Sequence, residues 1–157
     1  YGVLGTGPSH AGQDNSTEAM LYRQLGAIEF GQSLTLAVDG YIHTFFHHGR
    51  AGGRPWTSSS AGLAAEVMLD FAQSGLPLPN FIWSGHTHRS DDSGSKFRDT
   101  RAISLPSWQL KTSFGYRVSA GTVRSDIGGY IVVDGNIVDD SHSRYRGQPD
   151  QRRIIVV

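Results

Sequence analysis

The amino-acid sequence predicts an α/β domain built around a mixed β-sheet that is flanked by helices. In the first half of the chain a strand, a helix and a strand follow one another, and β-rich segments surround an Asp-Gly pair in both the first and the last third. Asp-Gly is a strong hairpin signal, because both residues tolerate the positive φ angles of a type I′ turn. The 157 residues, 38% of them hydrophobic, suffice for one core, so we expect a single domain over residues 1–157.

Two segments have the pattern of helices. Within residues 16–25, apolar residues follow an approximate capping box made by Asn15 and Glu18. Over residues 60–74, apolar residues recur at helical spacing until Gly75, which is typical of a helix end. The second helix leads directly into a strand.

The remaining elements are strands and the segments between them. Residues 1–6 read as the end of a strand that runs into a glycine turn, and the chain is expected to start within a domain. The polar residues 89–98 are expected to form a loop, and the polar tail 141–153 is expected to be peripheral. The expected strands are 34–38 and 41–46 around Asp39-Gly40, then 81–83 and 101–105, and finally 126–133 and 136–138 around Asp134-Gly135.

Composition narrows the function classes. Fourteen basic residues balance fourteen acidic ones, so net charge does not favour nucleic acid or an anionic membrane as a partner, although a local site for nucleic acid stays open. The absence of cysteine excludes disulfides, thiolate metal sites and thiol catalysis. No apolar run approaches the roughly 18 residues of a membrane span, so we expect no membrane partner and a cytoplasmic location.

Histidines cluster where two expected strands end. His47 and His48 follow the first hairpin, and His86 and His88 belong to a Gly-His-Thr-His motif that follows the strand after the second helix. Residues two apart in an extended chain face the same side, so this motif can address one metal ion or two adjacent ions. His43 lies inside a strand, and we expect it to be packed or hydrogen-bonded rather than a ligand.

The order of these motifs resembles the distal half of the calcineurin-like metallophosphoesterases, whose full pattern runs Asp-x-His, Gly-Asp, Gly-Asn-His, His, Gly-His-x-His. The similarity spans residues 1 to about 140 and is greatest to the phage-type branch. It implies the distal half of a four-layer αββα fold without its N-terminal βαβ segment. The matching pieces are Gly5-Thr6 with His10 and Gly12, His47 to Gly49, Pro79 to His88, Leu105 to Lys111 and Phe114 to Arg117.

The resemblance implies a role for the histidines of these motifs. His86 would bind one metal ion and His88 its neighbour, while His47 would be the third ligand, with His48 as the other candidate of the doublet. His10 would take the place of the substrate-facing histidine, which protonates the leaving group or holds a phosphate oxygen.

Substrate contacts are expected from basic groups beside these motifs. Arg50 follows the His-His doublet and Arg89 follows the second motif; their guanidinium groups, together with His48, would bind phosphate oxygens. The alternative for each arginine is that it is a solvated surface charge without a substrate. Thr6 stands roughly where the family has a ligating asparagine, and its hydroxyl is a poorer ligand.

The implied activity is hydrolysis of a phosphomonoester or phosphodiester, including nucleotide or nucleic-acid substrates. It needs two divalent ions, Mn, Zn, Fe or Ni, and a metal-activated hydroxide. The Asp-x-His and Gly-Asp segments do not precede Tyr1 in this sequence, so we expect an upstream segment or a separate chain to supply them. The isolated chain is then expected to bind metal weakly or to be inactive.

Two other classes compete with this interpretation. The first is a truncated, non-catalytic metal-binding or interaction module with structural histidines, which metal content and hydrolysis of a model phosphodiester would distinguish. The second is a metallo-β-lactamase-type hydrolase, whose His-x-His-x-Asp-His motif is not matched, because Asp91 falls one place late and its histidine partner is missing.

Overall fold

The computed structural model describes residues 2–3, 17–31, 33–47, 60–86, 90–108, 126–139 and 142–144. Neither of the helices in these ranges is long and apolar enough to cross a membrane. In chain order the elements are β1 (Gly2–Val3), α1 (Thr17–Gln24), β2 (Phe30–Gly31), β3 (Ser33–Val38), β4 (Tyr41–Phe46), α2 (Ser60–Gln73), β5 (Phe81–Ser84), β6 (Asp91–Asp92), the 3-10 turn η1 (Gly94–Lys96), β7 (Arg101–Ser104), β8 (Asp126–Gly128), β9 (Ile131–Val133), β10 (Asn136–Asp139) and β11 (His142–Arg144).

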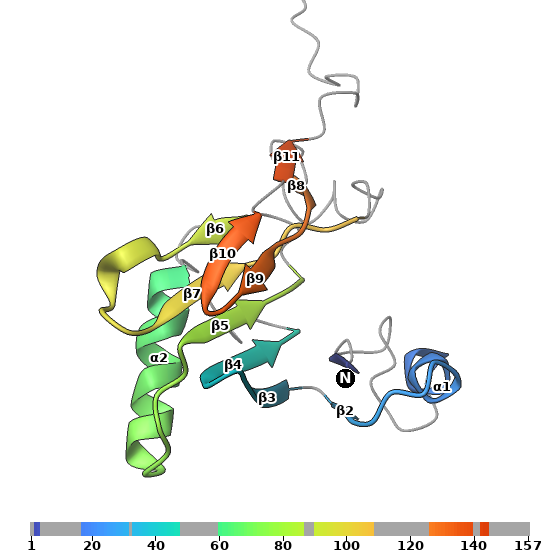
Figure 1. Ribbon diagram of the computed structural model, residues 1–157, viewed down its shortest axis with the longest axis horizontal. Coiled ribbons are helices and arrows are strands. Elements are labelled where there is room, and N and C mark those ends of the chain that lie inside the picture. Colours follow the sequence, from blue (N-terminus) through green and yellow to red (C-terminus); the bar gives the residue numbers. More distant parts are fainter. Residues whose placement is uncertain are drawn as a thin grey trace, which may run out of the picture.

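A five-stranded sheet in the order β3-β4-β5-β7-β6 forms the centre of the fold (Figure 1). Strands β4, β5 and β7 are parallel, whereas β3 and β6 pair antiparallel with their neighbours at the two edges. The sheet is therefore mixed, as the sequence predicts. Because β4, β5 and β7 are parallel, their carboxyl ends lie at one edge of the sheet, where α/β proteins commonly place their sites.

Helix α2 covers one face of this sheet. Its buried Leu63, Ala64 and Val67 pack against Ile82 of β5 and Ala102 of β7. Helix α1 lies beside β2, away from the five-stranded sheet (Figure 1). Within the described residues, the expectation of a sheet flanked by helices is thus met by α2 alone.

The opposite face is covered by the β9–β10 hairpin, which lies in front of β5 and β7 in Figure 1. Phe81, Trp83 and Ile103 are buried there against Tyr130 and residues of the hairpin. Strand β5 is buried at every position, because alternate side chains face α2 and the hairpin. Burial on both faces explains why its sequence is a continuous apolar run instead of an alternating one.

Both Asp-Gly turns are confirmed. Asp39 and Gly40 have φ angles of 51° and 83°, and Asp134 and Gly135 have φ angles of 48° and 71°. The two turns also lie close together, because a Cβ at Gly135 would overlap the ring of Tyr41. This contact fixes the tip of the second hairpin against the start of β4.

The predicted helices are also confirmed, as Thr17–Gln24 and Ser60–Gln73, with Gly75 at a φ of +67° after the second. Two predictions need correction. The expected strand 126–133 is divided into β8, which pairs with β11, and β9, which pairs with β10. The expected loop 89–98 contains β6 and η1. In the tail 141–153, the described residues 142–144 form β11, which pairs with β8 outside the five-stranded sheet. These strands are two or three residues long, so tertiary pairing and not local pattern decides them.

Candidate metal centre

Two of the predicted ligands meet at the carboxyl edge of the sheet. His47 directly follows β4 and His86 follows β5 by two residues. Because β4 and β5 are parallel neighbours with Phe46 opposite Ser84, both histidines leave the sheet at the same level. Their rings are in contact, with 3.2 Å between His47 Nε2 and His86 Nδ1.

The backbone at His86 is held in a rare conformation. Its φ angle is +69°, a left-handed value that costs a non-glycine residue about 1 to 2 kcal/mol. The preceding Gly85 is tied to β4, since its N–H donates to the carbonyl of Phe46 at 3.1 Å. Strain of this kind persists where the surrounding structure fixes it, and it concentrates at functional sites.

The distance between the two nitrogens is compatible with a hydrogen bond and also with a shared ion. Two imidazole nitrogens bound to one tetrahedral ion at about 2.0–2.1 Å would lie about 3.3 Å apart; the two nitrogens here are 3.2 Å apart and form a hydrogen bond. The ring planes are inclined by 65°, and the contact is exposed to solvent. Imidazole is a ligand that suits Zn, Cu, Fe and Ni.

The other predicted site residues cannot be placed. His10, His48, Arg50, His88 and Arg89 lie outside the described residues, so their roles remain predictions. Within the part of the chain that the structure describes, no group of three or more His, Cys, Asp or Glu side chains has the arrangement of a metal site. Of the predicted metal ligands, His47 and His86 are the two that the described residues bring together.

The expectation for His43 is confirmed. Trp83 Nε1 donates to His43 Nδ1 at 3.2 Å, and the imidazole is stacked on Phe81 with 4.9 Å between ring centroids. Burial lowers the pKa of His43, because desolvation disfavours the charged ring. With Nδ1 accepting a hydrogen bond, the neutral ring carries its proton on Nε2.

Asp91, the carboxylate considered for a lactamase-type site, has a structural contact. Its Oδ2 accepts from the backbone N–H of Ser60 at 2.8 Å, and the Ser60 hydroxyl donates to the Asp91 carbonyl at 3.0 Å. Asp91 therefore satisfies one of the free N–H groups at the start of α2. This contact weighs against the lactamase-type interpretation.

Asp126 is a buried carboxylate that no sequence motif singles out. This carboxylate is only 5% exposed, and its Oδ2 accepts from the backbone N–H of Ser90 at 2.9 Å. Nothing in the sequence distinguishes it from a surface aspartate at the start of a strand, because its partner is 36 residues away.

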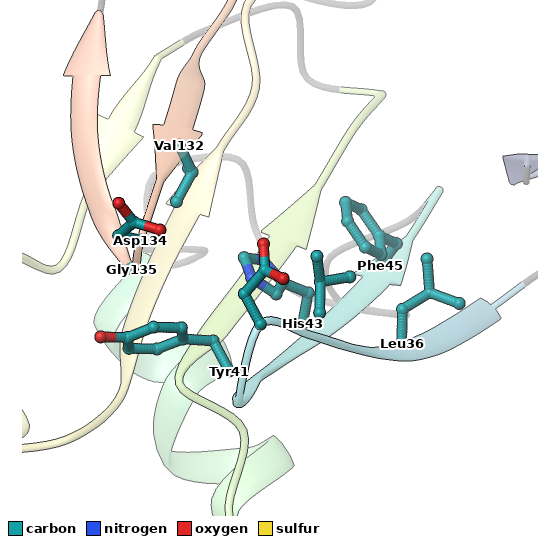
Figure 2. Close-up of a pocket in the computed structure, with 9 residues that line it drawn as sticks. Leu36, Tyr41, His43, Phe45, Val132, Asp134 and Gly135 are labelled. Atoms are coloured by element: carbon teal, nitrogen blue, oxygen red, sulfur yellow. The ribbon is translucent and has the colours of Figure 1, made fainter.

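A pocket of about 210 Å³ lies on the face of β3 and β4 beside the second hairpin turn (Figure 2). Among the described residues, its polar lining consists of two aspartates, Tyr41 and His43. A phosphate dianion would meet like charge at the two aspartates. The lining residues of the pocket are Leu36, Val38, Asp39, Tyr41, His43, Phe45, Val132, Asp134 and Gly135.

Comparisons with known proteins identify no family. No family model and no curated protein matches the chain. Among solved structures, the chain is similar to the solution NMR structure of Thermotoga maritima protein TM1076, with 17% sequence identity and a TM-score of 0.43 over 78% of this chain and 70% of that one. Similarity at this level assigns neither a family nor a function.

Proposed function

We propose that this chain is part of a metal-dependent phosphoesterase, which hydrolyses a phosphomonoester or phosphodiester. The observation that supports this most is the 3.2 Å approach of His47 Nε2 to His86 Nδ1 at the carboxyl edge of a mixed sheet. The two residues are 39 positions apart in the chain, and the sequence motifs single out both as ligands.

The proposed fold is the distal half of a four-layer αββα sandwich. The packing of α2 on one face of the sheet and of the β9–β10 hairpin on the other supports this arrangement. The missing half would come from an upstream segment or a separate chain, which would also bring the Asp-x-His and Gly-Asp ligands.

In this proposal the imidazoles of His47, His86 and His88 hold divalent ions. When bound, two such ions supply a hydroxide nucleophile and stabilise the charge on the phosphoryl oxygens. His10 would donate a proton to the leaving oxygen. Arg50, Arg89 and His48 would bind the non-bridging oxygens and orient the ester.

Calorimetric titration of the purified chain with Zn²⁺ and with Mn²⁺ tests the ligand assignment. His86→Ala should weaken binding at least about 100-fold, because one of two well-placed imidazoles is lost. Asp134→Asn is the matched control, since Asn-Gly also forms a type I′ turn and Asp134 lies at the pocket instead of the sheet edge. Equal affinity of wild type and His86→Ala would refute the assignment.

Activity is a separate test. Bis-p-nitrophenyl phosphate and p-nitrophenyl phosphate distinguish diesterase from monoesterase activity, and both should be assayed with Mn²⁺ on a chain that includes the upstream Asp-x-His and Gly-Asp segments. Turnover that disappears in His86→Ala and remains in Asp134→Asn is expected. Metal binding without turnover in that longer chain would contradict the enzyme proposal.

The alternative is a non-catalytic metal-binding or interaction module with structural histidines. The hydrogen bond between His47 and His86 favours this alternative, because it links the ends of β4 and β5 without any ion. A structural pair should stabilise the fold in metal-free buffer. His86→Ala would then lower the free energy of unfolding by about 1 kcal/mol in the presence of a chelator, whereas for a pure ligand pair the change should be smaller.

A further inference from the structure

The buried Asp126 joins the two segments that leave the carboxyl ends of β5 and β7. Its Oδ2 accepts from the N–H of Ser90 at 2.9 Å, and its backbone carbonyl accepts from the N–H of Ser107, also at 2.9 Å. Ser90 ends the segment that begins after β5, and Ser107 follows β7 by three residues. One residue of β8 therefore holds both segments.

Tyr130 adds a second contact to the same position. Its hydroxyl is hydrogen-bonded to the hydroxyl of Ser90, and its ring is tilted against Trp83 with 6.0 Å between centroids. Ser90 is thus held through its backbone by Asp126 and through its side chain by Tyr130. The next residue, Asp91, is fixed by Ser60 at the start of α2.

These contacts lie close to His86 in the chain. Ser90 follows His86 by four residues, and it is held by Asp126 and Tyr130. His86 has a φ of +69°, a value that persists in a non-glycine residue only where the surrounding structure supports it. An anchor four residues along the chain restricts the positions that the backbone at His86 can reach.

We propose that Asp126 and Tyr130 are positioning residues, which hold His86 in its place beside His47. The proposal rests on the proposed function and goes beyond it by assigning a role to two residues outside the histidine motifs. Burying a carboxylate is unfavourable unless hydrogen bonds compensate it, and Asp126 uses its Oδ2 for the backbone of this segment. Outer contacts of this kind tune metal sites, with effects of about 10- to 100-fold on affinity.

Three substitutions in the full chain test the proposal. Asp126→Ala removes the acceptor for the Ser90 N–H, Asp126→Asn keeps an oxygen that can accept it, and Tyr130→Phe removes only the hydroxyl. Asp92→Asn is the control, because Asp92 pairs with Arg101 on the surface and belongs to the neighbouring strand β6. Zn²⁺ affinity is measured by calorimetry, and the urea midpoint of each variant is measured in parallel.

Asp126→Ala should lose about tenfold or more in Zn²⁺ affinity, and Asp126→Asn should recover most of it. The affinity of Tyr130→Phe should fall by about threefold, and that of Asp92→Asn should equal wild type. A folded Asp126→Ala with wild-type affinity overturns the proposal. If Asp126→Ala does not fold, Tyr130→Phe decides: a lowered affinity supports the proposal and an unchanged one overturns it.

A measurement on the metal-free chain distinguishes failure of the positioning role from failure of the proposed function. If wild type binds no metal, the proposed function fails, and the imidazole resonances of His47 and His86 test the positioning role in the apo chain. Loss of the contact between the two rings in Asp126→Ala, with retention in Asp126→Asn, supports positioning. An unchanged contact in both variants refutes it.

Discussion

The strands β4 and β5 form two histidine contacts of different character. In the middle of the sheet, the imidazole of His43 accepts from Trp83 and is stacked on Phe81. At the carboxyl edge, His47 and His86 meet each other in a contact exposed to solvent. The same pair of strands thus makes one part-buried contact and one accessible contact. Position along the strand, not the residue type, determines how far each imidazole is exposed to solvent.

The largest stability effect should come from Gly135, in the turn that packs against Tyr41. Gly135→Ala places a Cβ on the ring of Tyr41 at a φ of +71°, and we expect the free energy of unfolding to fall by about 2 kcal/mol. Urea denaturation measures this change. Zn²⁺ affinity should not change, because the substitution lies away from the sheet edge.

A double-mutant cycle sharpens this prediction. In a Tyr41→Ala background the overlap is gone, so the cost of Gly135→Ala should fall to the backbone contribution of about 1 kcal/mol. Equal costs in both backgrounds would mean that Tyr41 does not limit the turn.

His43→Phe should have the next largest effect. Phenylalanine keeps a planar ring but cannot accept from Trp83 Nε1, and Trp83 is only 5% exposed. Leaving this donor without its acceptor should cost about 1.5 kcal/mol, in the lower part of the range for a buried unpaired donor, because the contact is part-buried. The urea midpoint measures the loss, and a wild-type midpoint would show that the hydrogen bond adds nothing to stability.

The same variant changes the pH dependence of stability. Burial lowers the pKa of His43 below 6.5, so the unfolded chain binds this proton more tightly than the folded chain. The contribution of neutral His43 to the free energy of unfolding is fully present above the unfolded pKa of about 6.5. It is lost as the pH falls toward the lower pKa of the folded chain. Urea midpoints measured from pH 8 down to about pH 5 should show this fall in wild type and a smaller one in His43→Phe.

A smaller effect is expected at the accessible contact. His86→Gly should be more stable than His86→Ala by about 1 kcal/mol, because glycine adopts a φ of +69° without strain. Both variants lose the imidazole, so both should lose metal affinity equally. Greater stability of the alanine variant would show that His86 is unstrained.

The smallest effect should be at the surface pair of Asp92 and Arg101. Asp92→Asn should change the free energy of unfolding by about 0.5 kcal/mol or less, since exposed ion pairs contribute little. Thermal denaturation at low and high salt checks this expectation. A larger loss would mean that the β6 edge contributes more to the fold than its exposure indicates.

The elements that local sequence encodes were predicted well. The two Asp-Gly turns, α2 and the strand β5 each carry a strong periodic or turn signal, and the structure has all of them. The approach of His47 to His86 also follows from sequence once β4 and β5 are taken as parallel neighbours. The candidate ligands closely follow strands whose apolar runs are clear in the sequence, and the existence of such elements is what patterns predict best.

The features that local sequence does not predict depend on contacts between segments that are distant in the chain. Strand β6 consists of two aspartates and exists because it pairs with β7. Strand β8 pairs with β11 and not with the hairpin beyond it. Asp126 acquires its role from Ser90, 36 residues away. No local propensity encodes such partners, so a single sequence gives no sign of them.

In the proposed metal site, the hydrogen bond between His47 and His86 would have a kinetic consequence for ion binding. One of the two facing nitrogens carries the shared proton, so its lone pair is not available to an incoming cation. That proton must first move to solvent or to the second nitrogen of its own ring. Association with Zn²⁺ should therefore accelerate when a small buffer molecule is present to shuttle protons, even where the equilibrium affinity stays constant.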